Sequence, residues 1–428
     1  MTNTYEKIRG EVVAGGALGE EDPVVGGPRA VLGIGAILLL LAVLAVASIW
    51  SFVFVVGLLI SIFLHECGHF FTARRSGMKV TQFFMGMGPK LWSTRRGEVE
   101  YGVRAIPVGA FVRIIGMNNL DETAPEDEPR AYRNKSYPRR MLTICAGSIM
   151  HMIIAIVLIF GTYATIGKGQ PGDRFVIGGV SAGSAAATAY VTGHPDMTMP
   201  LQAYDRIVSV DGQTPTSGKE LAAIVTSHKV GDPIDVVVER DGQLLNLTAK
   251  LGERPKGEEN AGQAFLGISS GYKTVFVRQS VGSAFVHGFT DLGDVTWQSV
   301  GGLVKVLNPV NIWQHVTGEN KDQSTQPTTI YGISKFSSTI GDETGFGGVL
   351  LMLAAVNVFV GLLNLVPLLP FDGGHAAIAT YERLRSRKGR EPYRADVGKM
   401  VPVAMAVMTF LVFLLSAGLY LDIARPIK

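Results

Sequence analysis

The fold of this chain is constrained most by residues 30–64, a run that contains no charged side chain. About 20 apolar residues in a helix span a bilayer, because each residue adds about 1.5 Å of rise. The run is therefore too long for one upright membrane helix. Two interpretations stay open: an extra membrane helix at 30–50 followed by a second at 51–75, which we favour, or a single long tilted segment.

Three later apolar segments, at 141–167, 347–380 and 400–424, predict further membrane helices. The composition agrees, since 47% of the 428 residues are hydrophobic and 18% are charged, against about 25% charged in an average soluble protein. The two cysteines, Cys67 and Cys145, lie in or beside apolar segments, so we expect no disulfide framework. The sequence therefore predicts a multi-pass α-helical membrane protein with four or five spans.

The charge distribution predicts how the chain is oriented in the cell membrane. Two loops, 76–140 and 381–399, are rich in Lys and Arg, and the positive-inside rule places both in the cytoplasm. Residues 1–29 are polar, acidic and Gly-rich without a signal-peptide pattern, and we expect a disordered head. The net charge of +3 and the lack of a basic stripe argue against a nucleic-acid partner.

A polar segment at 175–252 separates the membrane candidates and has a different pattern. Two Asp-Gly pairs, 211–212 and 241–242, follow residues that alternate between apolar and polar, as is typical of β-hairpins. Residues 221–227 read as a short helix. We therefore expect a water-soluble α+β module on the extracytoplasmic side, followed at 253–346 by a linker and an amphipathic surface helix.

Within the first basic loop, residues 82–89 and 100–113 alternate apolar side chains with Gly and Pro. This pattern predicts short strands with bends and does not favour helices.

One motif of the H-E-x-x-H type, His65-Glu66-Cys67-Gly68-His69, lies at the end of the first apolar run. Residues four apart share one face of a helix, so His65 and His69 can direct two imidazoles at one metal ion. Glu66 can then act as the general base toward a water on that metal. A chance match would be an ordinary helix face, but these polar groups are costly in an apolar helix unless they are paired or ligating.

A catalytic zinc site needs a third protein ligand. Asp372 is the best choice, because it ends an apolar segment broken by Pro367 and Pro370 and is followed by two glycines. His375 is the rival ligand. The plainer interpretation of Asp372 is a helix cap at the membrane edge, which is a common use of Asp.

With these motifs the chain resembles the site-2 proteases, intramembrane zinc metalloproteases, in the bacterial regulator-of-sigma-type subfamily with a PDZ domain between membrane segments. The resemblance covers about 52–424. It is carried by three motifs, which are His65-Glu66-Cys67-Gly68-His69, Gly86-Met87-Gly88-Pro89, and the string Asn364…Pro367…Pro370-Phe371-Asp372-Gly373-Gly374.

The resemblance implies a set of roles. His65, His69 and Asp372 would bind Zn²⁺, and Glu66 would activate the water. Asn364 would assist the binding of the substrate or the oxyanion. A membrane-reentrant β-loop would present the substrate as an extended strand, and its matching residues are Gly86, Gly88 and Pro89.

The resemblance also implies partners for the chain. The substrates would be single-span membrane proteins, such as anti-sigma factors or signal-peptide remnants, cleaved in regulated intramembrane proteolysis. The module at 175–252 would be a PDZ domain with a peptide ligand. The lipid bilayer would surround the spans, with the active site towards the cytoplasmic face.

Two departures from the family pattern stand out. His151 occupies the place where relatives usually have Asn, and Ser148 the place of Pro, so His151 is either a hydrogen-bonding group or a packed histidine. Tyr204 stands where glycine is common in the PDZ module, which puts its peptide groove in doubt.

Two other functions compete with a protease. A membrane metal or ion transporter would need polar residues along several helices and internal repeats, whereas the sequence has one cluster and no repeat. An inactive PDZ scaffold would need a broken ligand set, whereas Glu66, both histidines and Asp372 are present.

Overall fold

The computed structural model describes residues 27–117, 123–181, 183–254, 261–320, 322, 325–386 and 392–426. The expected disordered head at 1–29 lies outside the described residues, except for 27–29, which begin the first helix. The chain forms two compact units, a β-rich module at Lys168–Val277 and a second unit made of the chain before and after it.

Five helices among the described residues are long and apolar enough to cross a membrane, which decides the open count of four or five. The predicted multi-pass fold with an inserted α+β module is confirmed. The five helices are α2 (Gly27–Ala47), α3 (Ile49–Arg75), α4 (Tyr137–Thr165), α8 (Ile330–Asn364) and α10 (Val401–Ala424).

The apolar run at the start is two helices, so the alternative of one long tilted segment is wrong. Ser48 alone separates α2 from α3, because its backbone is extended, with φ −157° and ψ 114°. Its hydroxyl accepts a hydrogen bond from the N–H of Ser51 at 3.2 Å and so caps α3. A capped break needs only one residue, and α3 therefore begins at Ile49.

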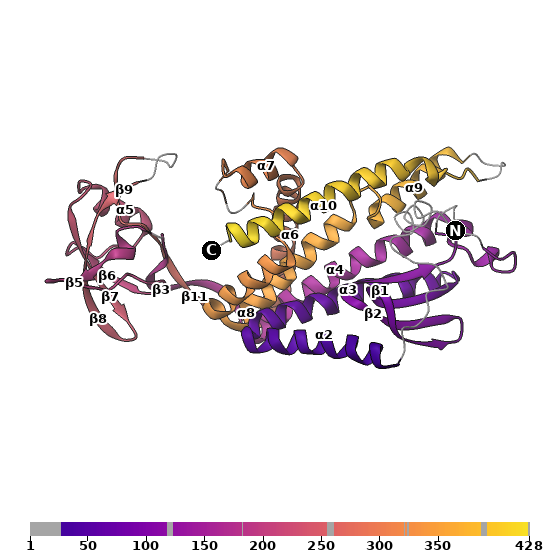
Figure 1. Ribbon diagram of the computed structural model, residues 1–428, viewed down its shortest axis with the longest axis horizontal. Helices are drawn as coiled ribbons and strands as arrows, with labels where there is room; N and C mark the ends of the chain where they lie inside the picture. Colours follow the sequence, from indigo (N-terminus) through magenta and orange to yellow (C-terminus); the bar gives the residue numbers. More distant parts are fainter. Residues whose placement is uncertain are drawn as a thin grey trace. The chain divides into compact units, whose positions relative to one another are not determined.

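Helices α3, α4 and α8 pack against one another in the membrane unit (Figure 1). Phe54 of α3 is buried with Leu353 of α8, and Ile159 of α4 is buried with Val358 of α8. These apolar contacts hold together the helix that carries His65 and His69 and the two helices packed against it.

Two helices, α6 (Val281–Val306) and α7 (Pro309–Thr317), follow the module in sequence. Ala284 and Gly288 of α6 are buried, whereas Phe285 and Phe289 are more than half exposed. This is the amphipathic helix that the sequence predicts; its place at the bilayer surface stays a prediction.

The basic loop contains a long hairpin, β1 (Val80–Arg96) and β2 (Val99–Ile114), where the sequence predicts only short strands. The hairpin folds back on itself, since residues 82–85 have partners both at 100–103 and at 110–113. Four segments thus lie side by side, in the order 90–96, 99–104, 80–87 and 110–114.

The predicted membrane helix at 347–380 is in fact two helices. α8 ends at Asn364, and α9 (Asp372–Arg385) is a separate helix that begins with the expected third ligand. Pro367 and Pro370 lie in the connection, where they lack the N–H that would continue the helical ladder. The described residues also contain four short 3₁₀ helices, Glu128–Arg130, Tyr132–Asn134, Ala186–Thr188 and Val397–Met400.

The β-rich module is built on a seven-stranded antiparallel sheet in the order β11-β3-β6-β7-β8-β4-β5 and contains the α-helix α5 (Gly218–Thr226). Its core contains Ile177, Val236 and Leu247, each at most 1% exposed. The strands of the sheet are β3 (Lys168–Val180), β4 (Tyr190–Val191), β5 (His194–Thr198), β6 (Arg206–Val210), β7 (Pro233–Arg240), β8 (Gln243–Lys250) and β11 (Ile268–Val277).

The module is longer than the expected 175–252. β11 pairs with β3 inside the segment expected as a linker, and a small ladder of β9 (Gly252–Glu253) and β10 (Ala264–Phe265) precedes it. The sequence pattern misses β11 because its partner strand lies far away in the sequence.

Candidate active site

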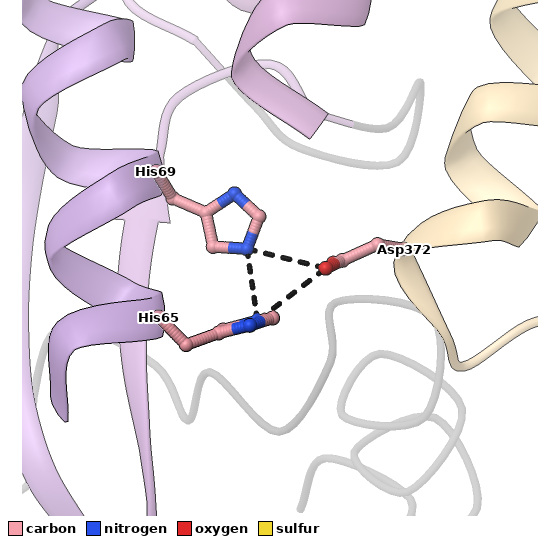
Figure 2. Close-up of side chains that lie close together, drawn as sticks. All are labelled: His65, His69 and Asp372. Carbon is pink, nitrogen blue, oxygen red and sulfur yellow. Dashed lines mark hydrogen bonds and ion pairs between the residues drawn. The ribbon is translucent and has the colours of Figure 1, made fainter. Parts of the chain in front are cut away.

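Three side chains from two helices distant in sequence converge on one point (Figure 2). His65 and His69 lie one turn apart on α3, and their Nε2 atoms are 3.1 Å apart. Oδ2 of Asp372, the first residue of α9, lies 3.4 Å from Nε2 of His65 and 3.2 Å from Nε2 of His69. The three atoms thus form a nearly equilateral triangle.

This triangle has the dimensions that zinc requires. Tetrahedral ligands with bonds of about 2.0–2.1 Å lie about 3.3 Å from one another, which matches the observed separations of 3.1 to 3.4 Å. Within the described chain, Oδ2 of Asp372 and Nδ1 of His65 are buried without a hydrogen-bond partner. A bound cation would satisfy the buried carboxylate oxygen.

The geometry favours one of the two possible third ligands. Among the described residues, the cluster with metal-ligand spacing contains Asp372 with His65 and His69, and His375 does not belong to it. The cap interpretation of Asp372 is also not supported, because Phe371 is the N-cap of α9 and no side chain caps this helix. The Asp372 carboxylate is directed at the two histidines instead (Figure 2).

One histidine is oriented by the backbone of α4. Nδ1 of His69 lies 2.8 Å from the carbonyl oxygen of Thr143, so this nitrogen donates and Nε2 keeps its lone pair for a metal. The sequence does not reveal this contact, because the backbone carbonyl of Thr143 makes it and the side chain does not.

Glycines let α4 and α9 approach the cluster. A Cβ on Gly147 of α4 would lie 2.5 Å from Nε2 of both His65 and His69, which leaves no room for any other residue. On α9, a Cβ on Gly373 would lie 2.3 Å from the carbonyl oxygens of Leu365 and Val366. Gly147 carries no chemical signal in the sequence, and the prediction of site residues misses it.

Glu66 lies between the cluster and the hairpin. Its carboxylate lies close to the backbone of Val112 in β2. The hairpin is held at this end of α3 by aromatic contacts, since the ring of Phe83 lies 5.5 Å from Phe63 and 5.3 Å from Phe70. The strand 110–114 is therefore beside the expected general base.

Gly86, Gly88 and Pro89 lie where β1 folds back, and the two glycines have positive φ angles of 86° and 83°. A buried arginine that sequence reasoning misses supports this turn. Nη1 of Arg104 donates to the carbonyl oxygen of Gly88 at 2.7 Å, and its guanidinium stacks on the ring of Phe84 at 4.9 Å. The expected substrate-binding turn is thus tied to a buried side chain of β2.

Asn364, the expected oxyanion-binding residue, is the last residue of α8 and is half-buried. Among the described contacts none joins its side chain to His65, His69 or Asp372. Asn364 directly precedes the connection at 365–371, which joins α8 to Asp372 at the start of α9.

A second concave site lies in the β-rich module, between α5 and the segment 265–270 that leads into β11. Leu221, Ala222 and Val225 line it from α5, and Phe265 and Ile268 line it from the other side. Tyr204 is not among the residues that line this concavity, and its effect on peptide binding stays a prediction. Tyr204 has a φ of 70°, which explains why glycine suits this position.

Comparisons with known proteins agree with this geometry. The model of peptidase family M50 matches residues 53–411. The chain is 33% identical over 396 residues to the zinc metalloprotease Rip1 of Mycobacterium bovis, covering 88% of this chain and 97% of the relative. It is 31% identical over 402 residues to Rip1 of Mycolicibacterium smegmatis, with the same coverage of 88% and 97%.

Two solved structures match about a quarter of the chain. The PDZ domain of an SdrC-like protein from Listeria monocytogenes is 24% identical, with a TM-score of 0.19, over 24% of this chain and 90% of that one. Its counterpart from Listeria innocua is 26% identical, with a TM-score of 0.18, over 23% and 93%. We refer to Lys168–Val277 as the PDZ-like module from here on, after the PDZ domain that the family resemblance of the sequence implies.

Proposed function

The chain belongs to peptidase family M50 and is an intramembrane zinc metalloprotease, and we propose that it cleaves single-span membrane proteins within their transmembrane segments. The observation that carries this proposal is the position of the cluster. His65 and His69 project from α3, which is itself long and apolar enough to cross the membrane. A peptide bond that reaches them must therefore enter from the membrane or its boundary.

In the proposed site, His65, His69 and Asp372 hold the metal. When bound, Zn²⁺ supplies a Lewis acid that acidifies a water molecule and polarises the scissile carbonyl. Glu66 takes a proton from the attacking water and later returns it to the leaving amine, so the carboxylate ends as it began. The amide of Asn364 donates a hydrogen bond to the oxyanion.

The hairpin positions the substrate. A transmembrane helix satisfies its own amide groups, so it must unwind before a peptide bond can be attacked. An unwound chain can replace its lost hydrogen bonds by pairing with a strand edge. The turn at Gly86, Gly88 and Pro89 and the strand 110–114 beside Glu66 are the parts of the hairpin that we assign to this task.

The orientation follows from the two basic loops at 76–140 and 381–399, which we place in the cytoplasm. His69 lies near the end of α3 that leads into the first loop, so the active site is towards the cytoplasmic face. The PDZ-like module then lies outside the cytoplasm, where its groove binds a peptide ligand. Anti-sigma factors and signal-peptide remnants are the substrate classes that the family suggests.

Membership of a peptidase family argues against the alternative of a membrane metal or ion transporter. The complete set of His65, His69 and Asp372, with Glu66 beside it, argues against an inactive scaffold.

Co-expression with a single-span substrate, tagged at both ends and trimmed outside the membrane, tests the proposal. Wild-type chain should release the cytoplasmic fragment, and Glu66→Gln should abolish it. Glu126→Gln, a matched change at an exposed glutamate, is the control and should leave cleavage unchanged. If Glu66→Gln still yields the fragment, cleavage does not depend on the proposed base and the proposal fails.

A further inference from the structure

His151 is a buried polar residue beside the metal cluster, and the mechanism above does not use it. It is 1% exposed, and its ring centroid lies 4.9 Å from that of His65. It follows Gly147 by one turn of α4, so both face the same way. The same helix face thus gives room to the two imidazoles at Gly147 and presents a third imidazole next to them.

His151 is a neighbour of the metal ligands and is not one of them. Within the described chain, the set of ligand atoms within 4.8 Å of one another comprises His65, His69 and Asp372 without His151. A group at this distance can reach a molecule bound at the cluster without entering the coordination sphere.

A hydrogen bond to Asn357 of α8 determines which ring nitrogen of His151 carries the proton. The amide Nδ2 of Asn357 donates to the carbonyl oxygen of Leu353 at 2.8 Å, which identifies its Oδ1 as an acceptor. This Oδ1 lies 2.8 Å from Nδ1 of His151. Nδ1 is therefore the donor, and Nε2 of the neutral ring keeps a free lone pair.

The ring is also held by packing between α4 and α8. A Cβ on Gly361, one turn after Asn357, would lie 3.0 Å from Cβ of His151 and 3.4 Å from the carbonyl oxygen of Ser148. The close approach of the two backbones leaves His151 little freedom to leave this position.

We propose that Nε2 of His151 is a catalytic acceptor, which receives a hydrogen bond from the water that attacks the scissile carbonyl. The inference rests on the proposed function. Water has two protons: Glu66 takes one and delivers it to the leaving amine, while the other stays on the oxygen and points at His151. A C–O bond forms, the C–N bond breaks, and His151 neither gains nor loses a proton.

Variants of the full-length chain in detergent test this role. His151→Phe keeps the ring and removes the acceptor; His151→Gln restores an acceptor oxygen. We expect His151→Phe to lower kcat by about 10–100-fold, the range for a lost hydrogen bond to a reacting group, with KM and the zinc content per chain unchanged. His151→Gln should recover part of kcat.

A second readout does not depend on activity. In the ¹⁵N-histidine-labelled chain, His151 should show protonated Nδ1 and unprotonated Nε2, and Asn357→Leu should produce a mixture of tautomers. The proposal is overturned if His151→Phe keeps wild-type kcat, if it loses zinc in proportion to activity, or if Nε2 carries the proton. A wild-type chain that does not cleave any substrate would refute the proposed function instead, while the tautomer would still decide the assignment of His151.

Discussion

Arg140 and Glu382 form a buried ion pair, with Nη2 of Arg140 2.7 Å from Oε2 of Glu382. Arg140 lies in the first turn of α4, and Glu382 lies on α9, the helix that begins with Asp372. Glu382 also accepts a hydrogen bond from the N–H of Ala395 at 2.9 Å. The pair therefore ties the helix of the third metal ligand to the helix that covers the two histidines.

Removal of one partner of this pair should weaken the metal site from a distance. Glu382→Leu leaves the Arg140 guanidinium buried and unpaired, which costs about 3–5 kcal/mol. We expect a lower thermal unfolding temperature and a lower zinc affinity, measured by calorimetry and by competition with a chelator. Glu98→Leu, which breaks the exposed pair with Arg130, is the control and should change neither. Equal effects of the two variants would contradict a specific role of the buried pair.

Gly147→Ala should empty the metal site, because the added Cβ would overlap both imidazoles at about 2.5 Å or less. The control is Gly161→Ala on the same helix, where a Cβ would meet nothing within 4 Å. Metal analysis of the purified proteins should show zinc in the Gly161→Ala variant and little in Gly147→Ala. Full zinc occupancy in Gly147→Ala would show that α4 does not approach the histidines this closely.

The identity of the third ligand is tested by a pair of substitutions on α9. Asp372→Ala should lower zinc affinity by more than the roughly 10–100-fold that loss of an outer contact causes. His375→Ala should keep the wild-type affinity, because His375 does not belong to the cluster of ligand atoms. The reverse order of the two affinities, measured with a fluorescent chelator, would make His375 the ligand.

Gly86→Ala should impair substrate binding without loss of zinc. The left-handed backbone at Gly86, with φ 86°, disfavours any side chain, and a Cβ there would lie 2.5 Å from the carbonyl oxygen of Ile106. The control for backbone strain alone is Gly97→Ala. Gly97 also has a positive φ, 63°, but a Cβ added there would meet nothing within 4 Å. We expect a raised KM for Gly86→Ala only. Equal KM values for the two variants would show that the fold-back turn does not take part in substrate binding.

The groove of the PDZ-like module can be blocked from α5. Ala222 lines the groove, whereas its exposed neighbour Ala223 does not. Ala222→Trp should abolish the binding of a peptide selected from a library on the full-length chain, and Ala223→Trp should keep it. Retained binding by both variants would place the peptide elsewhere on the module.

Most of the helical framework follows from the sequence. Residues 30–64 carry no charge, which predicts membrane-spanning helices, and the helical spacing of His65 and His69 places them on one face wherever that helix lies. The break between the first two helices is also a local event, since Ser48 caps α3 through its own hydroxyl. The α+β character of the inserted module appears in its Asp-Gly turns, and Asp241 and Gly242 do have positive φ angles of 52° and 77°.

The parts that the sequence does not reveal depend on contacts between distant segments. β11 is a strand because it pairs with β3, and the hairpin has four side-by-side segments because residues 82–85 bind two partners each. The alternating pattern at 82–89 and 100–113 predicts strands, but it does not reveal which distant segments pair with them.

The sequence by itself determined that the imidazoles of His65 and His69 and the carboxylate of Glu66 lie at the end of a membrane helix. Helical periodicity and the cost of burying polar groups are local properties of the chain. Only the tertiary structure decided how the site is completed. The packing of α9 brings Asp372, and not His375, to the histidines. The close contact of α3, α4 and α8 likewise makes Gly147 indispensable and gives His151 its partner Asn357. Such distances result from how helices pack, which no spacing along the chain encodes.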